Sequence, residues 1–240
     1  MRKIINSIPN ILTSGNLFCG CIAVVLALNG DIETATYFIF AAVVFDFFDG
    51  FAARLLKAQS SLGLQLDSLA DMVSFGVAPS AIVFHIMSIA QIHVPLELPA
   101  FTPYFAFFIA VFSALRLAKF NIDERQTAGF IGLPTPACSL FFCGLTYFDL
   151  FTVTGFYVLS AFIPLFCFLL VCELPMFSLK IKKTPDFAKK YSLQLLLVFS
   201  AVVFIAIWRL KGISITIAFY ITLSILVKIL HSHNMTKWQK

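Results

Sequence analysis

The chain has 240 residues, of which 60% are hydrophobic and only 12% charged, with a formal net charge of +5. Soluble domains contain about 45–50% apolar residues, and the longest polar stretch, residues 173–192, is too short to fold alone. The composition excludes a soluble globular protein and predicts one membrane domain over residues 1–240. It favours no nucleic-acid partner, because loop lysines facing anionic membrane lipids explain the basic excess.

Eight apolar segments are candidate membrane-spanning helices, since about 17–25 residues cross a hydrocarbon core of ~30 Å. They are Ile11–Leu28, Ala35–Leu55, Leu64–Ala90, Phe101–Leu117, Gly132–Phe148, Gly155–Val171, Leu193–Leu210 and Ile213–Leu230. We therefore predict an all-α fold, a polytopic integral membrane bundle of about eight helices. It divides into a six-helix core over residues 8–172, a basic loop over 173–192 and a C-terminal helix pair over 193–230.

The first and third segments need separate comment. Arg2 and Lys3 precede the first segment, as in a signal peptide, but Thr13 and Asn16 interrupt the apolar run, so we interpret it as a retained helix. The third segment is too long for a vertical span. It is expected to tilt, to project from the membrane, or to bend after Pro79.

Four carboxylates lie where the second segment ends and the third begins: Asp46, Asp49, Asp67 and Asp71. An aspartate at the bilayer centre costs about +2.5 to 3.5 kcal/mol on insertion scales, so such groups are functional candidates. The spacings i, i+3 and i, i+4 place each pair on one helix face. A short polar turn then lets two helices direct all four carboxylates at one volume.

A volume lined by four carboxylates suits cations. Arg54 can neutralise one of the four charges. Hard divalent ions with oxygen ligands, Mg²⁺ or Mn²⁺, complement the rest, and four carboxylates suffice for a two-metal site that binds phosphate oxygens. Gly50 and Ala53, on the side of the helix that carries the aspartates, leave a groove for a ligand or a second helix.

The residues around this turn have a fixed spacing. The pattern is Asp46-x2-Asp49-Gly50-x2-Ala53-Arg54-x8-Gly63-x3-Asp67-x3-Asp71. It resembles the signature of the CDP-alcohol phosphatidyltransferases, integral membrane enzymes of phospholipid synthesis. Three further stretches resemble the phosphatidylserine synthase branch: Ser74–Pro79, Arg116–Asn121 and Gly132–Ala137. With the N-terminal pattern Ile8-Pro9-Asn10-x2-Thr13-x2-Asn16, the likeness covers about residues 8–137.

The resemblance implies transfer of a phosphatidyl group from CDP-diacylglycerol to the hydroxyl of L-serine, with release of CMP. It implies that Asp46, Asp49 and Asp67 hold one or two Mg²⁺ or Mn²⁺ ions. It makes Asp71 the general base, a ligand of the second ion, or both. It also implies a homodimer.

Candidate substrate-binding residues follow from the same likeness and from charge. The CDP-lipid candidates are Gly50, Ala53, Arg54, Ser60, Gly63 and Asn16, and the serine candidates are Ser74, Arg116, Lys119 and Asn121. Several have simpler explanations. Arg54 can be a cation that extends to the interface, Ser60 an ordinary loop residue, and Asn16 a hydrogen-bonding residue between helices. Arg116 and Lys119 can be interfacial anchors.

Serine is the favoured acceptor because the cations near the site are few. A phosphorylated alcohol carries about two negative charges and would need several converging cations, whereas serine has one carboxylate. The alternatives are another transferase of this family, acting on glycerol 3-phosphate or an inositol phosphate, and an ion-coupled transporter. A transporter is expected to keep its carboxylates near the middle of the membrane, so their position at one turn favours the enzyme.

Basic residues predict the orientation of the chain. If the N-terminus is cytoplasmic, 15 of the 17 Lys and Arg residues lie on the cytoplasmic side, with Arg209 and Lys211 opposite. We therefore predict a multi-pass protein of the cell membrane whose active site faces the cytoplasm. The basic turn at residues 209–211 is an exception to the rule that Lys and Arg lie on the cytoplasmic side. The alternative to two membrane-spanning helices at the C-terminal end is a re-entrant hairpin formed by the last two segments.

Overall fold

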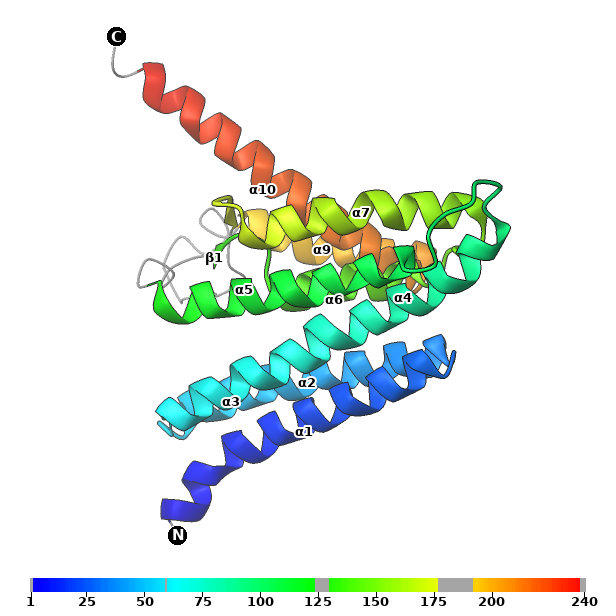
Figure 1. Cartoon of the computed structure of the whole chain (residues 1–240). Helices are drawn as coiled ribbons and strands as arrows, with labels where there is room; N and C mark the ends of the chain where they lie inside the picture. The colour runs from blue at the N-terminus through cyan, green and yellow to red at the C-terminus, as the bar shows by residue number, and fades with distance from the viewer. Residues whose placement is uncertain (1, 59, 124–129, 177–191, 238–240) are drawn as a thin grey trace.

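The computed structural model describes residues 2–58, 60–123, 130–176 and 192–237, which are almost entirely helical (Figure 1). The all-α prediction is confirmed. The helices are α1 (Arg2–Leu28), α2 (Ile32–Leu55), α3 (Ser61–Asp71), α4 (Ala78–Ala90), α5 (Phe108–Ile122), α6 (Thr135–Leu145), α7 (Val153–Val171), α9 (Ser192–Trp208) and α10 (Lys211–Lys237). Three shorter elements are the π-helical turn η1 (Met72–Val77) and the 3₁₀ turns η2 (Gln91–His93) and η3 (Thr102–Phe107).

The helical segments correspond to the eight predicted segments. Their length and apolar composition are those of a membrane protein. Five are long and apolar enough to cross a membrane: Ser7–Leu28, Ser61–His93, Thr102–Ile122, Val153–Val171 and Lys211–Leu230. The α6 and α9 helices are apolar but shorter. The α2 helix has the length, with 24 residues, but carries the charged groups of the predicted site.

The third predicted segment is one continuous helical rod from Ser61 to His93. The π-helical turn η1 connects α3 to α4 ahead of Pro79, after which a bend was one of three expected alternatives. Pro79 is the second residue of α4 and follows η1 closely, and a proline within a helical run removes one backbone hydrogen bond. A π-helical turn accommodates one residue more than an α-helical turn and is frequent at functional sites.

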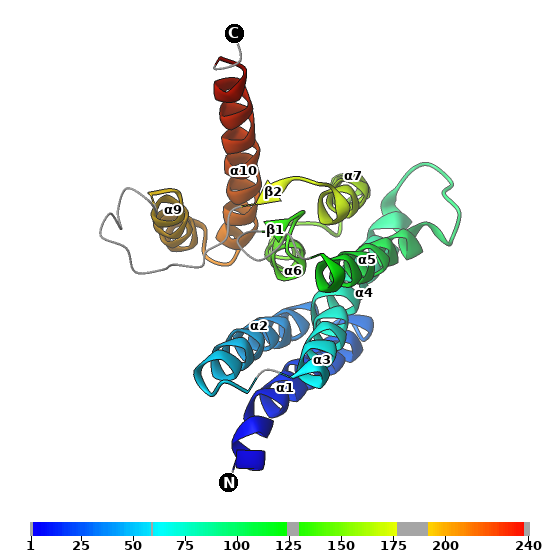
Figure 2. The same cartoon turned by 90° about the vertical axis from the view of Figure 1, so that its left-hand side faces the viewer.

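Two groups of helices are visible in both side views, with α4 between them. One group contains α1, α2 and α3, and the other contains α5, α6, α7, α9 and α10 (Figures 1 and 2). The first group begins with an α1–α2 hairpin whose turn contains Gly30 at a φ of +89°, a value that favours glycine. Asp31 then caps α2 by accepting a hydrogen bond of 3.1 Å from the Thr34 amide.

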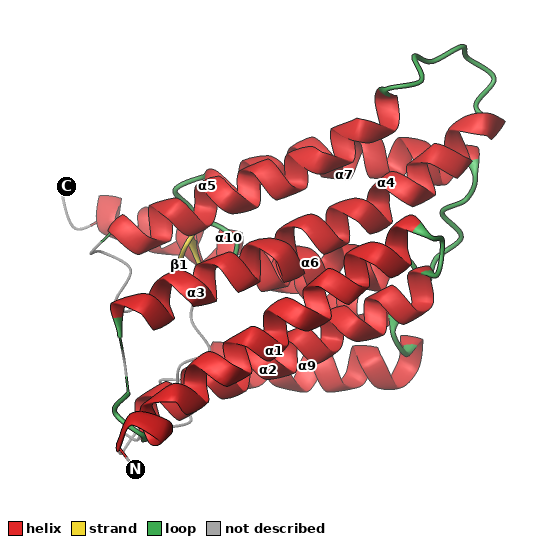
Figure 3. Cartoon of the chain, turned by 60° about the horizontal axis from the view of Figure 1, so that its bottom comes forward, coloured by secondary structure: helices red, strands yellow, loops and turns green. Residues whose placement is uncertain are grey.

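A short strap fixes the start of α6 beside the end of α7. Strand β1 (Phe130–Ile131) pairs antiparallel with strand β2 (Pro175–Met176), which is the only β structure within the described ranges (Figure 3). Gly132 follows at a φ of +78°, and a Cβ there would come within 3.1 Å of the Cys172 carbonyl oxygen. The Leu133 amide donates to the Leu169 carbonyl oxygen at 2.8 Å. The strap thereby sets the position of Thr135.

The C-terminal helices belong to the same packed body. Ser214 on α10 donates a 2.6 Å hydrogen bond to the Phe141 carbonyl oxygen on α6. The buried apolar cluster includes Leu197 of α9 and Tyr220 of α10 as well as residues of α2, α4 and α7. Most of the predicted basic loop, residues 177–191, lies outside the described residues.

Candidate active site

The turn between α2 and α3 brings the two halves of the carboxylate pattern together. After α2, Lys57 adopts a φ of +51°, which reverses the chain. Ser60 then caps α3, because its Oγ accepts a 3.0 Å hydrogen bond from the Gly63 amide. The Ser60 hydroxyl acts only as an acceptor in this cap, so its proton is still available for the predicted contact with a phosphate or with the cytidine.

Three of the four aspartates converge across this turn. One carboxylate oxygen from each of Asp46, Asp49 and Asp67 lies within 4.8 Å of the other two. Asp49 is buried, and its Oδ2 has no hydrogen-bond partner among the described residues. Like charges in such a space repel one another unless protons or cations intervene. The arrangement therefore requires protons or cations among the carboxylates.

The donor set fits a hard divalent cation. Its atoms are all carboxylate oxygens, the ligand type that Mg²⁺ and Mn²⁺ prefer. The unpartnered Asp49 Oδ2 is an available ligand atom within the cluster. Arg54, the nearest cation in the sequence pattern, is largely exposed on the rim. The site is thus suited to a metal.

Asp71 is not part of this group of three, but its carboxylate lies within hydrogen-bonding reach of Asp46. It lies one helical turn beyond Asp67, at the last residue of α3, and is only 8% exposed. Its Oδ1 accepts a 3.2 Å hydrogen bond from Nδ2 of Asn16 on α1. Its charge is repelled by Asp46 and Asp67 and attracted by Arg116 on α5. Side chains from four helices, α1, α2, α3 and α5, therefore act on this one carboxylate.

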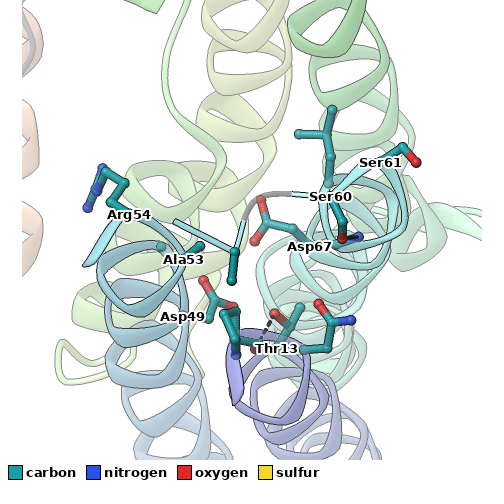
Figure 4. A pocket seen from close by; sticks show the side chains of 13 residues that line it. Thr13, Asp49, Ala53, Arg54, Ser60, Ser61 and Asp67 are labelled. Carbon is teal, nitrogen blue, oxygen red and sulfur yellow. Dashed lines mark hydrogen bonds between the residues drawn. The ribbon is translucent and has the colours of Figure 1, made fainter. Parts of the chain in front are cut away.

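A pocket of about 580 Å³ opens beside the carboxylates, between α1, α2 and α3. Figure 4 shows Asp49 on α2 and Asp67 on α3 facing each other, with Thr13 of α1 below them. The predicted residues that line the pocket are Asp49, Gly50, Ala53, Arg54, Ser60, Gly63 and Asp67. A Cβ on Gly50 would meet nothing nearer than the Arg54 guanidinium at 3.9 Å, so this wall is open.

Our candidate list missed three polar residues of the pocket: Asn10, Thr13 and Ser61. The first two belong to the N-terminal pattern and lie at i, i+3, on one face of α1. That spacing is the signal that could have identified them. A Cβ on Gly63 would come within 3.1 Å of Asn10 Oδ1, which shows how closely α1 approaches α3 here.

The predicted CDP-lipid residue Asn16 lies elsewhere. It is fully buried and does not line the pocket; its amide contacts Asp71 instead. Ser74, predicted to bind serine, is also fully buried and donates a 3.0 Å hydrogen bond to the Asn16 carbonyl oxygen. Asn16 thus contacts Asp71 and Ser74 contacts Asn16, and neither residue lines the larger pocket.

The other predicted serine ligands occupy two places on α5. Arg116 and Lys119 line a second cavity of about 330 Å³, together with Asp123 and Glu173. Arg116 Nη1 donates to Thr135 Oγ1 at 3.2 Å, and its guanidinium lies 5.0 Å from the centre of the Phe120 ring.

Asn121 points to another neighbour: its Nδ2 donates to Ser68 Oγ on α3 at 2.9 Å. The four predicted serine ligands are therefore not gathered in one pocket, and their role stays a prediction. Thr135, which holds Arg116, was missed. It lies 19 residues from Arg116, and no local spacing links the two.

The fold and the site define a class: a membrane-embedded helical protein with a partly buried aspartate cluster beside a pocket. A comparison with protein families agrees with this class. The family described as CDP-alcohol phosphatidyltransferase matches residues 6–172. Because the match covers well over half of the chain, the chain belongs to this family, and the resemblance of its aspartate pattern is confirmed.

Three similar proteins share one name, CDP-diacylglycerol–serine O-phosphatidyltransferase. The chain is similar to one from Bacillus subtilis (strain 168), at 43% identity over 131 residues, covering 55% of this chain and 70% of that protein. A Mycobacterium leprae (strain TN) protein is 30% identical over 210 residues, covering 83% and 67%. A Helicobacter pylori (strain J99) protein is 33% identical over 134 residues, covering 55% of this chain and 54% of its own length.

Proposed function

We propose that the chain is a phosphatidylserine synthase, which transfers the phosphatidyl group of CDP-diacylglycerol to the hydroxyl of L-serine and releases CMP. The observation that carries the proposal is the convergence of Asp46, Asp49 and Asp67 beside a pocket, in a member of a family of phosphatidyltransferases. The names of the relatives support the choice of serine. An ion-coupled transporter is disfavoured, because it is expected to keep its carboxylates near the middle of the membrane, whereas these lie on either side of the turn between α2 and α3.

Asp46, Asp49 and Asp67 would hold the divalent metal, Mg²⁺ or Mn²⁺. When bound, one or two such ions neutralise the pyrophosphate and polarise the phosphorus that is attacked. The open wall at Gly50 and Ala53 leaves space for the nucleotide, and Arg54 on the rim can pair with a phosphate oxygen. Ser60 and Gly63 lie at the start of α3, where a helix N-terminus favours an anion.

Asp71 is the proposed general base. The serine oxygen forms a bond to the lipid-side phosphorus, the bond between that phosphorus and the CMP oxygen breaks, and the serine proton passes to the Asp71 carboxylate. Phosphoryl transfer depends mainly on positioning and charge stabilisation, so the base needs a fixed position more than a high basicity. Asp71 can also ligate the second ion.

The α5 helix is the proposed acceptor side. Arg116 interacts electrostatically with Asp71 and also lines the second cavity. A carboxylate bound to its guanidinium would therefore bring a serine hydroxyl toward Asp71. Lys119 lines the same cavity and adds positive charge, and Asn121 reaches Ser68 on α3 from the same end of α5. Ser74 supports this side through Asn16.

We expect CMP release from CDP-diacylglycerol only when L-serine is offered. The assay uses purified protein in detergent and presents serine, glycerol 3-phosphate and an inositol phosphate in turn. Serine carries the single carboxylate that a few cations can bind, whereas the phosphorylated alcohols carry about two charges. Turnover with either phosphate and none with serine would reject the proposed acceptor and leave the family unaffected.

The site is proposed to face the cytoplasm of the cell membrane, on the basis of the distribution of basic residues. A cysteine placed at Ser60, and another at Gln239, should both react with a membrane-impermeant reagent from the cytoplasmic side only. The unmodified chain is the blank for its native cysteines. Labelling of residue 239 from outside would show an odd number of spans. The homodimer implied by the family resemblance is likewise a proposal.

A further inference from the structure

Asn16 makes a contact that joins two distant parts of the chain. Its side-chain amide, on α1, donates to Asp71 Oδ1 at 3.2 Å, across a separation of 55 residues. Both groups are buried, Asn16 completely and Asp71 to 8% exposure. In such surroundings a hydrogen bond to a carboxylate is stronger than one in water. The contact therefore restricts the orientation of the Asp71 side chain.

The other end of the Asn16 amide gains nothing from this arrangement. Its Oδ1 is buried and has no hydrogen-bond partner among the described residues. A buried acceptor without a partner costs about 1–3 kcal/mol. An asparagine present simply to join two helices would be expected to satisfy both ends of its amide. Here the N–H group is kept on Asp71 although the carbonyl oxygen is left unsatisfied.

The backbone of Asn16 is held as well. Ser74 Oγ donates to the Asn16 carbonyl oxygen at 3.0 Å. Ser74 belongs to the π-helical turn η1, which begins directly after Asp71. Gly20, one turn after Asn16, lies so close that an added Cβ would come within 2.8 Å of the Ser74 Cα. Helix α1 is thus pressed against η1, which leaves the Asn16 side chain little freedom.

We propose that Asn16 is a positioning residue for Asp71: its amide fixes one carboxylate oxygen, so that the other faces the hydroxyl of the acceptor alcohol. The inference rests on the proposed function, in which Asp71 accepts the proton of that hydroxyl. Arg116 attracts the same carboxylate from α5, so Asp71 is held from two sides. Asn16 then serves the acceptor step rather than the binding of the CDP-lipid.

The test replaces Asn16 with leucine, which has a similar shape and no hydrogen-bonding group. We expect kcat to fall by about 10–100-fold, the range typical for residues that orient a catalytic ligand, while the KM for CDP-diacylglycerol changes by less than about twofold. Asn16→Ala should show the same loss of kcat. Asn16→Ser, which keeps a donor hydroxyl, should lose less than Asn16→Ala.

Thr36→Val is the matched control. Thr36 is also fully buried, but its hydroxyl bonds only to the Ile32 carbonyl oxygen within α2. This variant should retain the wild-type kcat at a similar loss of thermal stability. The assay uses whichever alcohol releases CMP with the wild-type chain, so that a wrong acceptor assignment does not decide the result.

Two results would overturn the proposal. One is a wild-type kcat in Asn16→Leu or, if that variant does not fold, in Asn16→Ala. The other is an unchanged kcat with a raised KM for CDP-diacylglycerol, which would return Asn16 to the predicted CDP-lipid contacts. A loss of kcat confined to the Asn16 variants supports it.

Discussion

Replacement of Asp71 by asparagine is expected to lower turnover by about 10²–10⁴-fold, the usual contribution of a general base. An amide cannot accept the acceptor's proton, although it has nearly the same size. Binding of CDP-diacylglycerol should be kept in part, because Asp71 does not line the pocket and is not one of the three aspartates whose oxygens converge beside it. The variant therefore separates acceptor activation from CDP-lipid binding.

The measurement compares kcat with the dissociation constant for CDP-diacylglycerol in the two proteins. Asp31→Asn is a suitable control, since asparagine also caps helices and Asp31 lies at the opposite end of α2. Its activity should equal that of the wild type. If Asp71→Asn lost affinity and turnover to the same extent, Asp71 would be chiefly a metal ligand on the nucleotide side.

Removal of divalent ions is expected to abolish turnover. Asp46, Asp49 and Asp67 place their oxygens within 4.8 Å of one another, and an anionic pyrophosphate cannot approach that cluster without a cationic complement. Addition of Mg²⁺ or Mn²⁺ should restore activity, because both ions prefer oxygen ligands. Arg54 by itself is insufficient, because it supplies a single positive charge.

The experiment is treatment with EDTA, followed by dialysis and titration with each ion. A second measurement needs no turnover. The affinity of the EDTA-treated protein for Mn²⁺ is measured from the paramagnetic signal of the ion, and Asp49→Asn should lower this affinity. Asp149→Asn, in the turn between α6 and α7, provides the matched control. Full activity in metal-free buffer would exclude the proposed metal site.

The number and order of the helices were predictable from hydropathy, because each apolar segment is long enough to identify a helix without information from the other segments. The convergence of Asp46, Asp49 and Asp67 was predictable too, since a helical period and one short turn determine it. The hydrogen bond from Asn16 to Asp71 was not. It joins residues 55 positions apart, and a contact between distant segments leaves no local periodicity in a single sequence.

The acceptor side was harder to predict for a related reason. Charge counting selected Arg116 and Lys119, but the direction of each side chain depends on partners that no pattern announces. Thr135 is positioned by the strap at Gly132, whose backbone bonds to the end of α7. The order of the polar residues along α5 therefore does not reveal which of them face α3 and which face α7.

The π-helical turn η1 also affects how related sequences should be aligned. One residue added to a helix rotates everything after it by about 100° relative to what precedes it. A homologue with one residue fewer between Asp71 and Ala78 could keep every aspartate in place while presenting a different face of α4 to its neighbours. An alignment gap at Met72–Val77 would thus mark a change in helix rotation, and covariation of α4 with α1 and α5 would have to be computed separately on either side of it.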